Sequence, residues 1–107
     1  MRGDLSQLMK KAQQAQKSLE KAKEEIARLE ITGESGGGLV KVRMTGNHDV
    51  RSVVLDPEVL KEDKAMVEDL IAAAMNDAVR RVAKESQERI AGVTAGLNLP
   101  PGINPFS

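Results

Sequence analysis

The first third of the chain carries a heptad repeat that no glycine or proline interrupts. From Leu5 to Leu29, apolar or small residues occupy the a and d positions, while Gln, Lys, Glu and Ala fill most of the others. These residue types favour helix, and a heptad places the apolar ones along one seam. We therefore predict a helix of about 25 residues, roughly 38 Å long, within residues 1–30. Its seam is narrow and rich in alanine, so the helix needs another helix to pack against.

The middle of the chain has the pattern of strands. Apolar and polar residues alternate from Val40 to Thr45, which is the period of a half-buried strand. Val50–Leu55 is rich in β-branched residues, and Gly46-Asn47 between the two runs indicates a hairpin turn. A short strand around Glu30–Thr32 precedes them. Residues 30–56 are thus predicted to form a three-stranded antiparallel β-meander.

A second long helix is predicted after the meander. Asp63 can cap a helix that starts at Lys64, and a broad apolar stripe then repeats with helical spacing as far as Ile90. Gly92 is expected to end this helix, because glycine is common just past a helix C-terminus.

These elements together predict one α+β domain over residues 1–107. A chain of 107 residues has room for a single modest core. The expected parts are the helix in residues 1–30, the β-meander in residues 30–56, a short turn with the second long helix in residues 57–91, and an extended tail in residues 92–107.

Gly33–Gly38 fits the first six positions of a phosphate-binding loop, G-x-x-x-x-G. Such a loop continues with Lys and then Ser or Thr, whereas Leu39 and Val40 follow here. It also joins a strand to a helix, whereas this segment joins two predicted strands. The sequence therefore indicates a hairpin connection and no nucleotide site.

Little in the chain suggests catalysis or a bound metal. It has no Cys, and its single His, His48, stands beside a Gly-Asn turn. The acidic residues from Asp56 to Asp63 lack the spacing of a calcium loop, and no set of Ser, His and acid suggests a catalytic triad. We expect no enzymatic activity, no cofactor, no metal site and no small-molecule substrate.

The chain also lacks the marks of export and of membrane insertion. It has no charged start that leads into an apolar run, and no run approaches about 18 apolar residues. A cytoplasmic location without membrane contact is therefore expected. With one Phe and neither Trp nor Tyr, the chain offers almost no ring on which single-stranded bases could stack.

The net charge of zero conceals two basic segments separated by an acidic one. One lies on the first helix, opposite its apolar seam, and the other lies in the C-terminal half of the second helix. If the helices pack antiparallel, these segments meet as cationic helical tips that suit a phosphate backbone, although a solvated helix face is the plainer explanation. The candidate DNA-binding residues are Lys10, Lys11, Gln14, Lys17, Lys21, Arg80, Arg81, Lys84 and Arg89.

Five stretches between Leu8 and Gly102 resemble the YbaB/EbfC family of small bacterial nucleoid-associated DNA-binding proteins, in order and in spacing. They read LMKKAQQAQ, TGESGGGLVKVRMTG, DPEVL, VEDLIAAAMNDAVRR and GLNLPPG. The resemblance implies an intertwined homodimer with protruding helices that binds double-stranded DNA in the nucleoid, without a cofactor. It further implies a part in nucleoid organisation or gene expression. The alternative is a helical protein-interaction or scaffold module without direct DNA binding.

Overall fold

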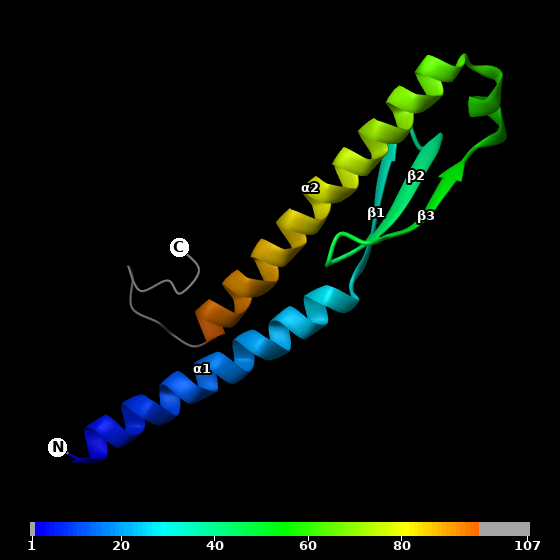
Figure 1. Cartoon of the computed structure of the whole chain (residues 1–107). Coiled ribbons are helices and arrows are strands. Elements are labelled where there is room, and N and C mark those ends of the chain that lie inside the picture. The colour runs from blue at the N-terminus through cyan, green and yellow to red at the C-terminus, as the bar shows by residue number, and fades with distance from the viewer. Residues whose placement is uncertain (1, 97–107) are drawn as a thin grey trace.

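The computed structural model describes the backbone of residues 2–96 and the side chains of residues 4–95 (Figure 1). In this part of the chain, two long helices flank a three-stranded antiparallel sheet of order β1-β2-β3, as the α+β prediction requires. The elements are α1 (Arg2–Arg28), β1 (Glu30–Ser35), β2 (Val40–Thr45), β3 (Val50–Leu55), the 3-10 helix η1 (Pro57–Lys61) and α2 (Lys64–Gly96).

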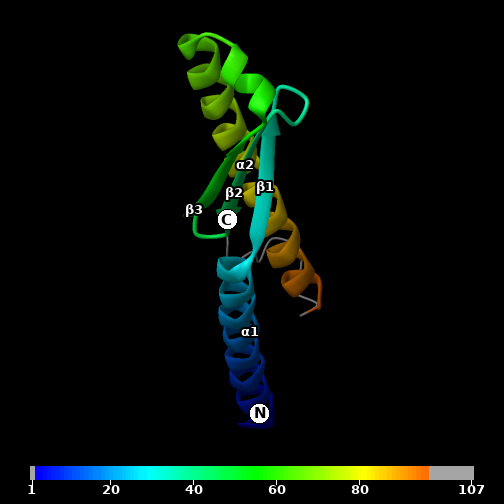
Figure 2. The same cartoon turned by 90° about the vertical axis from the view of Figure 1, so that its right-hand side faces the viewer.

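The elements form two layers (Figures 1 and 2). Helix α2 crosses one face of the sheet, where it contacts β1 and β2, and then continues along the C-terminal half of α1. The sheet and α1 thus lie end to end against α2, and the two helices run antiparallel. The result is an elongated molecule of 73 × 23 × 16 Å.

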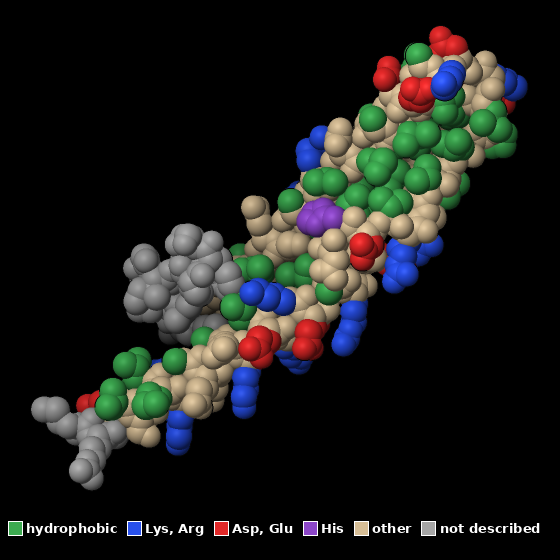
Figure 3. Space-filling model, viewed as in Figure 1, with side chains coloured by type: hydrophobic (Ala, Val, Ile, Leu, Met, Phe, Trp, Pro, Cys, Tyr) green, Lys and Arg blue, Asp and Glu red, His purple; other side chains and the backbone are tan. Residues whose placement is uncertain are grey.

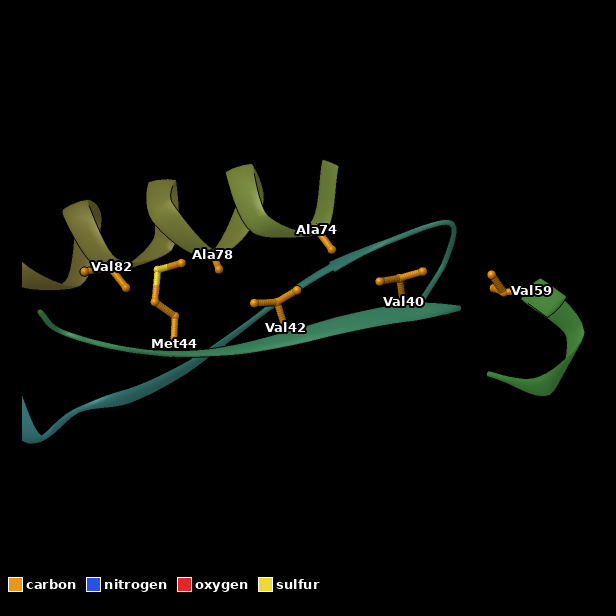
Figure 4. Close-up of a cluster of buried hydrophobic side chains, with 7 residues drawn as sticks. All are labelled: Val40, Val42, Met44, Val59, Ala74, Ala78 and Val82. Atoms are coloured by element: carbon orange, nitrogen blue, oxygen red, sulfur yellow. The ribbon is translucent and has the colours of Figure 1, made fainter. Parts of the chain in front are cut away.

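The core is a thin layer between α2 and the sheet (Figure 4). Because β2 alternates, its apolar side chains all point toward α2, and small residues on α2 let the helix backbone approach the strands closely. The buried side chains of this cluster are Val40, Val42, Met44, Val59, Ala74, Ala78 and Val82.

Two element boundaries differ from the prediction. Strand β1 continues past Thr32 to Ser35, because the glycine-rich segment begins inside the strand and Gly33 to Ser35 pair with β2. Helix α2 continues through Gly92 to Gly96. A glycine costs only about 1 kcal/mol inside a helix, and residues 93 and 94 beyond it are half-buried. Residues 97–107 of the predicted tail lie outside the described residues.

The glycine run has a conformational reason. Gly36, Gly37 and Gly38 have φ angles of 61°, 69° and 96°, in the left-handed region that other residues rarely adopt. They form the tight turn between β1 and β2. The segment is therefore a strand-to-strand connection, as predicted.

Candidate nucleic-acid interface

Helix α1 presents a line of long polar side chains on the face opposite α2. Lys10, Gln14, Lys17 and Lys21 are all exposed, and their spacing places them along one side of the helix. Figure 3 shows Lys and Arg side chains along this edge of α1. We call Lys10, Lys17 and Lys21 the lysine row. None of the three forms an ion pair with another side chain of residues 4–95.

Among the described residues, the apolar seam of α1 is covered only in its C-terminal half. Ala22 and Ile26 are 4% and 8% exposed, whereas the side chains near the start of the helix are exposed. In both views, the N-terminal part of α1 extends beyond the described end of α2 (Figures 1 and 2). Antiparallel packing was expected to place the start of the first helix beside the end of the second. Instead, the start of α1 protrudes beyond the described end of α2. Lys11 is also exposed on this protruding part.

The basic residues of α2 do not form a helical tip. Arg80 and Arg81 lie in the middle of α2, and both approach Asp77: Arg81 Nε donates a hydrogen bond to Asp77 Oδ2 at 2.9 Å, and Arg80 Nη2 is 3.9 Å from Oδ1. Farther along, Arg89 Nε is 3.4 Å from a carboxylate oxygen of Glu85. These arginines already have carboxylate partners.

Lys84 lies in a shallow groove of about 460 Å³ beside β1. The groove is lined by Ile31, Arg81, Lys84, Glu85 and Glu88, so two acidic side chains offset its two basic ones. The structure thus brings Arg81 and Lys84 together beside the sheet. It places the lysine row on a different part of the molecule.

Asp77 connects α2 to β1. Its Oδ2 accepts a hydrogen bond from the backbone N–H of Glu34 at 2.9 Å, in addition to the bond from Arg81. The Glu34 N–H is the main cause that holds the pKa of Asp77 below its usual range; partial burial opposes it, and Arg81 and Arg80 add to it. The pairing with Arg81 was foreseeable from the helical spacing, whereas the contact with Glu34 was not.

Asp77 should make the stability of the protein depend on pH in the acidic range. Because its pKa is lowered on folding, its stabilising effect is complete above the pKa of an unfolded aspartate, about 3.9, and is lost as the pH falls through the lower folded value. Wild type is thus expected to lose stability with acid more steeply than Asp77→Asn. Urea unfolding between about pH 2 and pH 6 measures this, with exposed Asp69→Asn as the control. Equal pH profiles for wild type and Asp77→Asn would contradict the assignment.

An uncharged surface lies between α2 and β3. Val50 and Val53 are on the side of β3 that faces α2, yet they are 41% and 43% exposed. Met75 and Val79, on the flank of α2 away from Asp77, are 37% and 41% exposed. Figure 3 shows hydrophobic side chains gathered over this region. We call these four residues the β3/α2 apolar face. Met75 and Val79 belong to the predicted stripe of α2, but a single helix does not reach far enough over the sheet to bury them.

Residues 1–97 match the model of the YbaB/EbfC DNA-binding family. The chain belongs to this family. The match confirms the resemblance found in the sequence, and it supports DNA binding by a nucleoid-associated protein. The family is described by DNA binding and not by a catalysed reaction.

A similar fold occurs in a solved structure. The chain is similar to the crystal structure of the uncharacterized protein HP0035 from Helicobacter pylori, with 25% sequence identity and a TM-score of 0.56. The similarity covers 68% of this chain and 86% of that chain. Among the described residues, no helix combines the length and the apolar character needed to span a membrane. No group of three or more His, Asp or Glu side chains in that part is placed to hold a metal ion.

Proposed function

We propose that this protein binds double-stranded DNA as a homodimer, mainly through phosphate-backbone contacts from α1. The lysine row is the observation that carries the proposal, because it is exposed, unpaired among the described side chains and directed away from α2. From Lys10 to Lys21 the helix rises about 16 Å, which is the length of roughly five base pairs. The row thus matches a short stretch of phosphate backbone.

The two helices contribute unequally to the proposed interface. On α1 it comprises Lys10, Lys11, Gln14, Lys17 and Lys21, and on α2 it comprises Arg80, Arg81, Lys84 and Arg89. The three arginines of α2 would have to exchange a carboxylate for a phosphate, whereas the lysines of α1 would not. Lysine also binds phosphate as a point charge, without the rigid two-pronged geometry of arginine. We therefore expect at most a mild sequence preference.

The β3/α2 apolar face supports the proposed homodimer. Val50, Val53, Met75 and Val79 form one uncharged surface beside an exposed edge strand, which is the kind of surface that proteins cover by association. A second copy of the chain would cover it and present two protruding α1 helices to one duplex. Through such binding the protein would act on nucleoid organisation and gene expression in the cytoplasm.

Charge reversal of the lysine row tests the proposal. A variant with Lys10→Glu, Lys17→Glu and Lys21→Glu should bind a labelled duplex at least about 100-fold more weakly, because three phosphate contacts become repulsive. Fluorescence anisotropy measures the affinity. The matched control reverses three exposed lysines outside the row, Lys23, Lys61 and Lys64, and should retain most of the affinity. Unchanged binding by the lysine-row variant would overturn the proposal.

The protein-interaction module is a second candidate function, favoured by a specific observation. On the protruding part of α1, Leu5, Leu8 and Met9 are 59% to 64% exposed. Such a face suits a partner helix. This alternative predicts no duplex binding even at low salt, which the same titration detects.

A further inference from the structure

The outer face of the sheet, on the side away from α2, carries a cluster of basic and hydroxyl side chains. Alternation along the strands places Thr32, Lys41, Arg43 and Ser52 on this side, together with Glu34 and Val54, and Thr32, Arg43 and Ser52 are direct neighbours across the three strands. Arg51 stands at the irregularity in β3 and reaches the same side, where its Nε is 4.0 Å from Glu30. No helix of the described chain covers this face.

We infer that this outer sheet face is a second DNA-contact surface, with Arg43, Arg51 and Lys41 as its phosphate-binding residues. An open polar face is common in antiparallel sheets, so exposure alone would not support the inference. Two observations do: the charge arrangement at Glu30, and continuity with the lysine row. The inference rests on the proposed function.

The charges around Glu30 are unbalanced. Arg43 and Arg51 both approach this one carboxylate, and their side chains are 51% and 64% exposed. One guanidinium is therefore in excess at Glu30. Lys41 forms no ion pair within 4.0 Å with a described side chain, and its direct neighbour across the strands is Glu34. The Ser52 hydroxyl, opposite Arg43, is shielded and lacks a hydrogen-bond partner among the described residues. Because the Ser52 hydroxyl is shielded, the exposed guanidinium groups of Arg43 and Arg51 are the donors available to phosphate oxygens.

The outer sheet face continues the lysine row. The sheet and α1 lie end to end against α2, so the sides of both that face away from α2 belong to the same side of the molecule (Figures 1 and 2). Lys and Arg side chains accordingly follow one edge from α1 onto the sheet (Figure 3). From Lys10 through the sheet this surface is on the order of 50 Å long, about 14 base pairs, against roughly five for the lysine row alone.

Neutral substitutions at both ends of the molecule test the inference. Arg43→Gln with Arg51→Gln should weaken binding to a random duplex of about 20 base pairs roughly 10-fold, and should reduce the log–log salt slope by about 1 to 1.8. Lys61→Gln with Lys64→Gln removes two cations from surface ion pairs at the end of η1 and the start of α2. This variant should bind DNA as wild type does. Equal behaviour of the two variants would overturn the inference.

Glu30→Gln provides an opposite test on the same face. It releases both arginines from their shared carboxylate, so binding should tighten several-fold and the salt slope should steepen. If these ion pairs only stabilise the sheet, Glu30→Gln binds DNA no more tightly than wild type, and the inference fails. Circular dichroism checks that each variant folds. If the variant with Arg43→Gln and Arg51→Gln does not fold, Lys41→Gln takes its place.

The two proposals can fail separately. If wild type binds no duplex, the proposed function is wrong. If charge reversal of the lysine row abolishes binding while the Arg43 and Arg51 substitutions leave it unchanged, only the second surface is wrong.

Discussion

Gly33→Ala is expected to lower the free energy of unfolding by about 3 kcal/mol, the upper part of the range for overpacked cores. A methyl group at Gly33 would lie 2.6 Å from Ala78 Cα and 2.6 Å from the carbonyl oxygen of Ala74. These are backbone atoms of α2, so no side chain can turn aside to relieve the overlap. The helix would have to move off the sheet, and the thin core would open.

Urea unfolding followed by circular dichroism at one fixed protein concentration measures this effect. Gly92→Ala is the matched control, because a methyl group there meets nothing within 4 Å and the residue lies inside α2. It should raise the free energy of unfolding by about 1 kcal/mol. A Gly33→Ala protein as stable as wild type would mean that α2 does not approach the sheet as closely as described.

Val53→Glu is expected to convert the proposed homodimer into a monomer. Val53 is already 43% exposed in the single chain, so the monomer tolerates a charge there, whereas a covered β3/α2 apolar face does not. DNA affinity should fall about 100-fold or more, because two linked α1 helices bind one duplex more tightly than one does.

Light scattering gives the mass in solution, and anisotropy gives the affinity. Val54→Glu is the control for the mass alone, because Val54 lies on the outer sheet face: it is the next residue along β3, is 53% exposed and points to the other side of the sheet. Val54→Glu should remain a dimer, and Val79→Glu, on the α2 side of the same apolar face, should behave like Val53→Glu. If Val53→Glu has the mass of wild type, the β3/α2 apolar face is not the dimer interface.

Local pattern was enough to predict the elements and the strand that carries the core. The alternation in β2 correctly placed Val40, Val42 and Met44 on the buried side. The helix stop at Gly92 was wrong, because the residues after it pack and offset the cost of a helical glycine. The stripe of α2 also contains Met75 and Val79, whose exposure depends on the width of the sheet beneath, and that width is not encoded in the helix itself.

For the candidate interface, too, the sequence predicted the arrangement along one helix but not the contacts between elements. The lysine row follows from helical spacing alone, and the structure shows it on one face of α1. The placement of Arg80 and Arg81 depends on where α2 crosses β1, which sequence spacing does not reveal. Arg43 and Arg51 are eight residues apart on two strands, and only the strand register and the irregularity in β3 bring them to Glu30.

The most direct test of DNA binding through phosphate contacts is a titration of wild-type protein into a labelled random duplex at several salt concentrations, with single-stranded DNA and RNA as competitors. We predict duplex binding whose logarithm falls linearly with the logarithm of the salt concentration, with a slope of about −0.9 for each phosphate neutralised. Absence of duplex binding even at the lowest salt concentration would contradict the account and would favour a protein partner instead.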